Sequence, residues 1–437
     1  MQQSIFDLMY EKYKIKTPIK IIELFGGYGS QFLSLKYIGA NVKHHKLVEW
    51  ASKSIQAYND LHIQDYTDYS KEMSNEEVLQ KVYEMGVSLD YNQPATKEQL
   101  SRQDYRRIYN NIIATDNLVD VSRVKGKDLE INDKEHFTYL LTYSFPCQDL
   151  SLSGKMAGMS DTSTRSGLLW EVGRILKECE KINQLPQILL MENVVQVHSQ
   201  SQDNAKDFAK WQQLLENMGY KNYFQDLIAT DYGMPQTRNR CFMISILGNY
   251  SYQFPKPIPL KLKLKDLLED NVSNDYYITE KQIEDIKKWN AFEKPLENME
   301  RIDKTNISPT LTTRSGAYAA GMILVKNNTK KGYQEATDGD GIDLAYPNSE
   351  TRRGRVQKNT IQTLTTQNNL GVCVKQKCLD NQLKIRHITP KEAFRLMGVK
   401  DEDFEKVQKN QSDSSLYHLA GDSIVTNCLQ AIFKELL

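Results

Sequence analysis

Residues 18–30 read P-I-K-I-I-E-L-F-G-G-Y-G-S and decide the fold. The apolar run at residues 19–25 follows a proline and has the composition of a buried strand. Glycines then interrupt the run, and residues 30–39 show the apolar spacing of a helix. A strand, a glycine turn and a helix form the opening unit of an open α/β sheet, in which glycine lets the backbone approach a nucleotide-like ligand. The spacing F-G-G-Y-G differs from the dinucleotide fingerprint.

A second strand is predicted at residues 42–48, and it ends in Glu49 and Trp50. An acidic residue at the end of the second strand suits a ribose diol, and an indole can stack on a purine. An exposed glutamate and a core tryptophan are the alternative interpretation.

Residues 143–153 read Y-S-F-P-C-Q-D-L-S-L-S and place Cys147 directly after a buried strand predicted at residues 137–143. A thiol at the carboxyl end of such a strand faces the crevice where open α/β sheets bind ligands. Cys147 is therefore a candidate nucleophile, with a small, inert, buried cysteine as the alternative. The following residues, 151–165, have the composition of a loop that closes over a site.

Polar residues also follow two later apolar runs. The predicted strand at residues 188–191 ends in Glu192, which we expect in the same crevice as Cys147. Gln236, Arg238 and Arg240 alternate along an extended segment, so they share one face. This face suits an anionic or base-edge ligand, and a solvated edge strand is the alternative.

An insertion is predicted at about residues 65–127. Capping boxes at Ser74 and at Thr96 predict two helices there, and we expect no chemistry from them. A short apolar run at residues 118–121 predicts a third strand that carries Asp120.

Composition changes at the proline-rich residues 254–259, which predicts a domain boundary. We divide the chain into a catalytic and cofactor-binding domain (1–255), a smaller and mostly β domain (256–384), and a return to the first domain (385–437). The smaller domain repeats itself, because P-T-L-T-T at residues 309–313 reappears as Q-T-L-T-T at residues 362–366. The repeat presents side chains that can bind base edges and phosphates, although a chance repeat is the alternative.

Bulk composition limits the partners and the compartment. The chain has 437 residues and 56 basic against 56 acidic side chains, so anion binding has to come from local patches. Its 6 cysteines include no C-x-x-C pair, which predicts a reduced, cytoplasmic protein without a metal site. No leader or membrane span is expected.

Together these segments resemble the C5-cytosine-specific DNA methyltransferase family. The resemblance rests on six motifs in the family's order, namely E-L-F-G-G-Y-G-S, S-F-P-C-Q-D-L-S, M-E-N-V, Q-T-R-N-R, I-T-P-K-E-A-F-R-L-M-G and G-D-S-I-V-T-N. It implies a Rossmann-like, S-adenosylmethionine-dependent methyltransferase sheet with a smaller, mostly β target-recognition domain. Asp422 stands where the family usually has Asn, which affects one expected amide contact to the cofactor.

The resemblance also implies site residues. The catalytic residues expected are Cys147, Glu192, Arg238 and Arg240. The residues expected to bind S-adenosylmethionine are Phe25, Gly27, Gly29, Glu49, Trp50, Asp120, Pro146, Leu168 and Asp422. The residues expected to bind DNA are Gln148, Ser151, Ser153, Gln236, Thr312, Thr313, Arg314, Arg353, Arg355, Thr365, Thr366 and Gln367.

The resemblance implies a DNA (cytosine-5-)-methyltransferase that acts through a covalent adduct between Cys147 and C6 of a flipped-out cytosine. We expect a monomer that binds a specific sequence of double-stranded DNA, and a companion restriction endonuclease remains open. The alternatives are a sequence-specific DNA-binding protein with a decayed active site, an RNA cytosine-5 methyltransferase, and a nicotinamide-linked oxidoreductase. The last of these would leave Cys147 and Glu192 unexplained.

Overall fold

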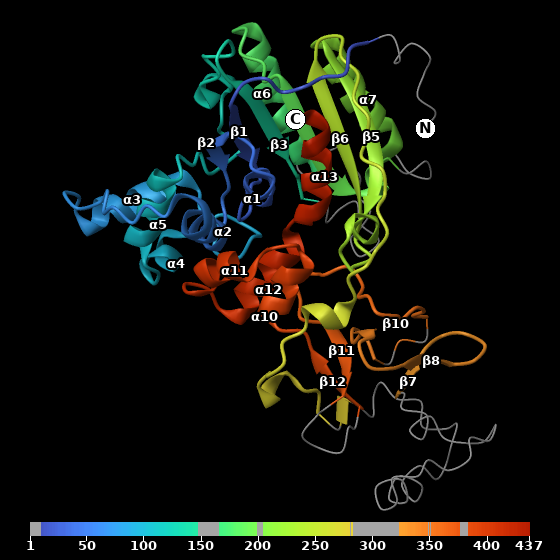
Figure 1. Cartoon of the computed structure of the whole chain (residues 1–437). Helices are drawn as coiled ribbons and strands as arrows, with labels where there is room; N and C mark the ends of the chain where they lie inside the picture. The colour runs from blue at the N-terminus through green and yellow to red at the C-terminus, as the bar shows by residue number, and fades with distance from the viewer. Residues whose placement is uncertain are drawn as a thin grey trace, which may run out of the picture.

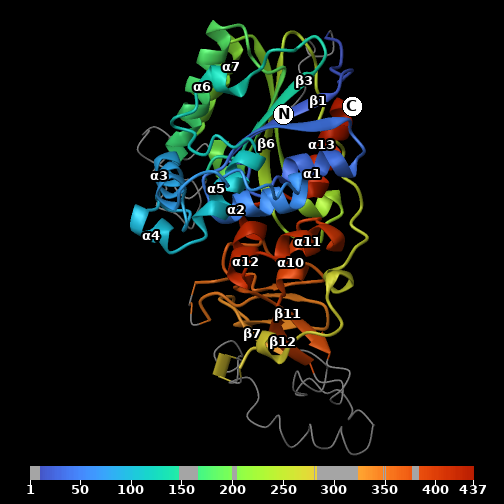
Figure 2. The same cartoon turned by 90° about the vertical axis from the view of Figure 1, so that its left-hand side faces the viewer.

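The structure is a computed structural model that describes residues 10–146, 166–198, 204–279, 281–282, 323–347, 349, 351–375 and 383–437. A large sheet covered by helices forms one part of the molecule, and a smaller β part lies at the other end. Helices α10, α11 and α12 lie between the two parts in both views (Figures 1 and 2). The α/β fold predicted from the sequence is confirmed.

The large sheet has six strands in the order β2-β1-β3-β4-β6-β5. Strands β2, β1, β3 and β4 are parallel, whereas β6 is antiparallel to both of its neighbours. The strands are β1 (Ile19–Leu24), β2 (Val42–Val48), β3 (Thr138–Tyr143), β4 (Ile188–Val194), β5 (Tyr220–Ile228) and β6 (Asn239–Leu247). Strands β3 and β4 are buried along their whole length, as expected for central parallel strands. The chain order reverses around β1, so ligands are expected at the carboxyl ends of β1 and β3.

Helices cover both faces of this sheet. Apolar residues of α1 and α13 pack on one face, and those of α6 and α7 pack on the other. Within the described residues, the α-helices outside the insertion are α1 (Ser30–Tyr37), α2 (Ser52–Tyr58), α6 (Leu169–Lys181), α7 (Asn204–Asn217), α10 (Pro390–Leu396), α11 (Asp401–Gln408), α12 (Asp413–Asp422) and α13 (Thr426–Leu436). The last four helices bring the end of the chain back onto the first sheet.

The insertion has three helices, where two were predicted. They are α3 (Asn75–Met85), α4 (Lys97–Ser101) and α5 (Tyr105–Ala114), and they extend to one side of the sheet (Figure 1). The caps at Ser74 and Thr96 are confirmed, but Asp104 caps a new helix and so divides the second predicted helix. The strand predicted at residues 118–121 is wrong, because these residues form no strand. The Leu118 N–H donates to the Leu47 carbonyl of β2 at 2.9 Å.

The smaller β part contains two sheets. One has the order β10-β9-β11-β12, and β7 pairs with β8 in the other. These strands are β7 (Ile323–Lys326), β8 (Tyr333–Ala336), β9 (Gly341–Asp343), β10 (Val356–Gln357), β11 (Leu370–Lys375) and β12 (Leu383–His387). The division of the chain at residues 255 and 384 stays a prediction. Among the residues described, no helix combines the length and apolar composition of a membrane span.

A buried hydrogen-bonded chain lies behind the glycine turn. Glu23 is fully buried at the end of β1, and Tyr58 Oη lies 2.7 Å from its Oε2. His44 Nδ1 lies 2.9 Å from the same hydroxyl, while His44 Nε2 lies 2.7 Å from the carbonyl of Thr115. Nε2 must donate to this carbonyl, and burial lowers the pKa of His44 to about 4. The Tyr58 hydroxyl donates to Glu23 Oε2, and the backbone N–H of Phe32 donates to its Oε1 at 3.2 Å, so the carboxyl group is hydrogen-bonded but fully buried.

Burial accordingly raises the pKa of Glu23 to about 7. The folded protein then holds a proton that the unfolded chain releases at lower pH, so this group loses its stabilising contribution as pH rises from about 4.5 to 7. His44, with its lowered pKa, acts in the opposite direction, so a comparison of variants is needed to isolate Glu23.

We predict that Glu23→Gln removes this contribution. The free energy of unfolding of the native protein minus that of the variant should fall by about 3 kcal/mol between pH 4.5 and 8. Urea unfolding across this range measures the difference, and Glu216→Gln on the exposed side of α7 is the control. A difference that does not change with pH would contradict a protonated Glu23.

Candidate active site

A hollow opens where β1 and β3 end. Its lining includes Phe25 after β1 and Ser144 after β3, at the position expected from the strand order. The hollow holds about 400 Å³ of empty space, part of it open to solvent. The lining residues are Phe25, Gly26, Gly27, Tyr28, Ser30, Gln31, Ser54, Tyr91, Ser144, His418, Leu419, Asp422, Ser423 and Ile424.

The glycine turn has an unusual backbone that a buried carboxylate holds in place. Phe25 and Gly27 have φ values of 57° and 54°, in the left-handed region. The backbone N–H of Gly27 donates to Glu49 Oε2 at 2.9 Å, and that of Ala51 donates to Oε1 at 2.8 Å. A Cβ atom added at Gly27 would meet nothing within 4 Å, so the backbone is open to a ligand there. Glu49 thus shapes the turn, and its expected ribose contact stays a prediction.

Buried polar atoms in the lining call for a ligand. The hydroxyls of Tyr28, Tyr91 and Ser423 are buried and make no hydrogen bond shorter than 3.5 Å within the described part of the chain, although Ser423 is near Tyr28 and Ser54 is near Tyr91. An unsatisfied buried hydroxyl costs about 1–3 kcal/mol, so such groups are expected to face a polar partner. S-adenosylmethionine carries an ammonium group, a carboxylate, ribose hydroxyls and adenine nitrogens. The residues present therefore fit this cofactor.

Only part of the predicted cofactor set lines the hollow. Phe25, Gly27 and Asp422 do, and the Asp422 carboxylate also pairs with His418 Nδ1 at 3.1 Å. The predicted residues outside the lining are Gly29, Glu49, Trp50, Asp120, Pro146 and Leu168.

Internal packing explains why three of these lie elsewhere. Trp50 is partly buried and packs against the hydrophobic cluster of the insertion, and its predicted contact with a purine stays a prediction. Asp120 pairs with Arg123 at 3.0 Å and accepts a hydrogen bond from Ser122. A Cβ at Gly29 would lie 2.6 Å from atoms of both Tyr58 and His62, so this glycine serves close packing.

Glu192 and Arg240 meet at the carboxyl end of β4. Glu192 is 4% exposed, and its Oε1 lies 3.3 Å from Arg240 Nε. The Ser144 hydroxyl donates to Oε2 of the same carboxylate at 2.5 Å. Antiparallel pairing of β4 with β6 brings the two side chains together, because Val194 lies opposite Arg240. Two residues predicted to contact the same base are therefore neighbours.

Seven predicted residues lie outside the described part of the chain. They are Cys147, Gln148, Ser151, Ser153, Thr312, Thr313 and Arg314.

The prediction that Arg238 faces a substrate is wrong. Arg238 is 5% exposed, and its guanidinium donates to the carbonyls of Leu364, Gly421 and Ser423 at 3.0, 2.9 and 2.7 Å. These carbonyls come from the second T-L-T-T segment and from the end of α12. Arg238 therefore joins the catalytic sheet to both.

Gln236 is fully buried, so it is not available to DNA as predicted. Its amide N–H donates to the carbonyl of Leu396 at 3.0 Å, and its oxygen accepts from the backbone of Leu364 at 3.1 Å. Gln236, Arg238 and Arg240 alternate as expected, but only Arg240 reaches the site, because the first two precede β6 and are covered by other segments.

Of the residues predicted to read DNA, Arg355 is also buried. Its guanidinium donates to backbone carbonyls including those of Asp343 and Ala345 at 3.2 and 3.1 Å, so it holds a turn rather than a phosphate. Arg353, Thr365 and Gln367 are exposed.

Thr366 is partly buried because its segment packs closely on α12. A Cβ at Gly421 would lie 2.4 Å from the Thr365 backbone and 2.6 Å from the Thr366 nitrogen. Only glycine permits this contact.

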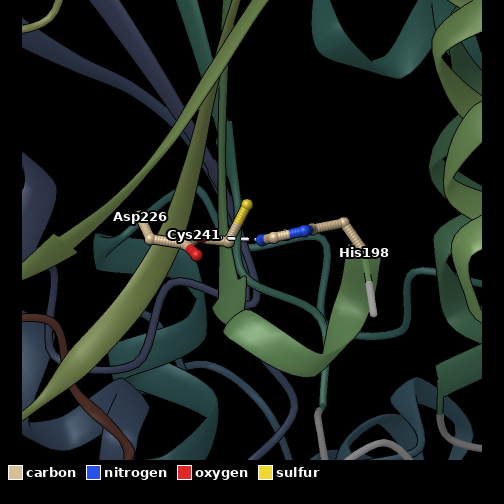
Figure 3. Close-up of side chains that lie close together, drawn as sticks. All are labelled: His198, Asp226 and Cys241. Atoms are coloured by element: carbon tan, nitrogen blue, oxygen red, sulfur yellow. Dashed lines mark hydrogen bonds and ion pairs between the residues drawn. The ribbon is translucent and has the colours of Figure 1, made fainter. Parts of the chain in front are cut away.

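A second polar cluster is formed by His198, Asp226 and Cys241 (Figure 3). His198 Nε2 lies 2.8 Å from Asp226 Oδ1, and the ligand atoms of both lie within 4.8 Å of Cys241 Sγ. Burial raises the pKa of the Cys241 thiol, so the sulfur keeps its proton and is a poor metal ligand. We interpret this cluster as structural, because His198 ties the segment after Glu192 to β5. Sequence spacing offered no signal for it.

A family model described as C-5 cytosine-specific DNA methylase matches residues 98–437. The type II methyltransferase M2.ScrFI of Lactococcus lactis subsp. cremoris is 29% identical over 96% of this chain and 99% of that protein. The orphan methyltransferase M.SssI of Spiroplasma monobiae is 31% identical over 97% of this chain and 99% of that protein. The solved structure of the S. pombe Dnmt2 methyltransferase is similar in fold, with a TM-score of 0.51 at 16% identity over 96% of this chain and 98% of that one.

Arg238 and Arg240 allow a matched test of these assignments. We predict that Arg238→Ala lowers the free energy of unfolding by about 3 kcal/mol, because it leaves buried carbonyls without a donor. Arg240→Ala should lower stability by less than Arg238→Ala does, because it removes one ion pair with Glu192, whose carboxylate keeps the hydrogen bond from Ser144. Urea unfolding of both variants measures this. Equal stabilities would show that the Arg238 guanidinium is not a structural tie.

Proposed function

The chain belongs to the C-5 cytosine-specific DNA methylase family, and from this premise we propose which residues carry out its reaction. The protein is a DNA (cytosine-5-)-methyltransferase that uses S-adenosylmethionine. This family membership excludes the nicotinamide-linked oxidoreductase. The residue roles below are our proposal.

We propose Cys147 as the nucleophile. C5 of cytosine is too weak a nucleophile to accept a methyl group directly, and addition of a thiolate to C6 makes C5 enamine-like. A cysteine suits this step because it is intrinsically nucleophilic near neutral pH. S-adenosylmethionine, when bound, supplies the methyl group that C5 accepts. A base then removes the proton from C5, and the Cys147 sulfur leaves C6 as the C5–C6 double bond forms again.

The observation that carries this proposal is the contact between Glu192 and Arg240. Addition to C6 moves negative charge toward N3 and O2 of the ring. Glu192 sits buried at the tip of β4 and can share a proton with N3, while Arg240 lies 3.3 Å away and can donate to O2. Ser144 donates to the other oxygen of Glu192 and so orients the carboxylate.

The target base has to leave the double helix, because its C6 face is stacked inside a duplex. Flipping costs a few kcal/mol. We propose that Gln148, Ser151 and Ser153 close over the flipped nucleotide. We further propose that residues 256–384 form the target-recognition domain between catalytic segments 1–255 and 385–437, with exposed Arg353, Thr365 and Gln367 on its DNA side.

We propose that the protein acts as a monomer, because one chain supplies both the catalytic and the recognition surfaces. A cytoplasmic location follows from its DNA substrate. A companion restriction endonuclease remains an open partner, since one relative is named a type II and another an orphan methyltransferase.

Substitutions at the two central residues test the mechanism. We predict that Cys147→Ala binds duplex DNA but transfers no methyl group, because no adduct can form at C6. Glu192→Gln should also retain DNA binding and should lower kcat by about 100-fold or more, because it cannot supply a proton to N3. Radiolabelled methyl transfer and filter binding measure both properties, with Glu216→Gln as the control. Native turnover in either variant would contradict the role proposed for that residue.

Bisulfite sequencing of diverse unmethylated DNA incubated with the protein tests the function itself. We expect protected cytosines within one short sequence context, and only when S-adenosylmethionine is added. Protection that is absent, or that does not depend on the cofactor, would contradict the proposal.

A further inference from the structure

The insertion contributes a residue to the hollow, although no chemistry was expected from it. The loop between α3 and α4 carries Tyr91, whose ring belongs to the lining. Backbone hydrogen bonds hold this loop against the start of α2, since Ser88 N–H donates to the Trp50 carbonyl at 2.8 Å and Ser52 N–H donates to the Ser88 carbonyl at 2.9 Å. The loop is therefore fixed beside the glycine turn.

The backbone at Tyr91 has a strained conformation. Tyr91 has a φ of 63°, in the left-handed region that bulky residues rarely adopt. Asp90 supports the turn, because its Oδ1 accepts the backbone N–H of Asn92 at 2.9 Å and that of Gln93 at 3.2 Å. Strain of this kind persists where surrounding structure supports it, and it collects at ligand sites.

Tyr91 stacks on His418, which also lines the hollow. The two rings lie 3.7 Å apart with an interplanar angle of 14°. His418 belongs to α12, and its Nδ1 pairs with Asp422, another residue of the lining. The stack therefore joins the insertion to the C-terminal segment at the candidate cofactor site.

The Tyr91 hydroxyl is buried and makes no hydrogen bond shorter than 3.5 Å within the described residues, and the side chains of Ser54 and Ser415 are polar groups near it. Burial and the nearby carboxylates of Glu49 and Asp422 raise the pKa of this phenol, so it keeps its proton and can donate a hydrogen bond. Tyr91 is the aromatic side chain that the insertion places in the hollow.

We propose that Tyr91 is a cofactor-binding residue, with its ring forming part of the wall of the S-adenosylmethionine site and its hydroxyl donating to the cofactor. The insertion then contributes a residue to the cofactor site and is more than a helical addition to the sheet. This inference rests on the proposed function and deepens it.

Two substitutions separate the hydroxyl from the ring. Tyr91→Phe removes the donor alone and should weaken binding of S-adenosylmethionine and of its product S-adenosylhomocysteine by about 3- to 10-fold. Tyr91→Ala removes the ring as well and should weaken binding further. Tyr83→Phe, on the exposed side of α3, is the matched control and should bind as the native protein does. Isothermal titration calorimetry without DNA measures these affinities.

Steady-state kinetics add a second readout. We expect KM for S-adenosylmethionine to rise in Tyr91→Phe while kcat at saturating cofactor stays near the native value, and DNA affinity without cofactor should not change. Because Tyr91→Phe keeps the ring stacked, the test does not depend on how well Tyr91→Ala folds.

Native affinity in both Tyr91 variants would overturn the inference. Tighter binding in Tyr91→Ala would also overturn it, because Tyr91 would then compete with the cofactor for the hollow. If the native protein itself bound no cofactor and methylated no DNA, the proposed function would fail, which is a different result from failure at Tyr91 alone.

Discussion

The guanidinium of Arg238 is the contact on which the arrangement of this protein depends. It binds carbonyls from residues 126, 183 and 185 positions later in the chain, and these lie in the T-L-T-T segment and at the end of α12. Five fixed N–H donors suit arginine to this task. Two residues further on, Arg240 pairs with Glu192. The hydrogen bonds of Arg238 and the ion pair of the candidate site therefore come from one short segment.

The same junction brings recognition and catalysis into contact. The backbone of Thr365 packs on Gly421, and the next residue, Asp422, lines the candidate cofactor site. Gln236 adds hydrogen bonds to Leu364 and Leu396. If the T-L-T-T segment binds DNA as proposed, a shift of this segment would displace the end of α12, because packed interiors transmit displacement.

Buried carboxylates shape the cofactor side. Glu49 accepts the backbone N–H groups of Gly27 and Ala51, and Glu23 lies behind the same turn in a chain with Tyr58 and His44. Such groups are costly to bury unless hydrogen bonds satisfy them. The cost of burying Glu49 is offset by these two hydrogen bonds, one of which holds the left-handed backbone of Gly27 in the turn.

The sequence by itself determined the local features. Apolar runs predicted β1, β3 and β4, capping residues predicted the starts of α3 and α4, and the family resemblance implied that Glu192 and Arg240 contact the same base. The strands and the helix starts depend on neighbours in the chain. Only the tertiary structure decided which polar side chains the fold itself uses. Arg238, Gln236 and Arg355 bind internal carbonyls, and Tyr91 rather than Trp50 lines the hollow. Their partners lie on other segments, and for Arg238 and Gln236 those segments are more than 120 residues away, so no local pattern marks them.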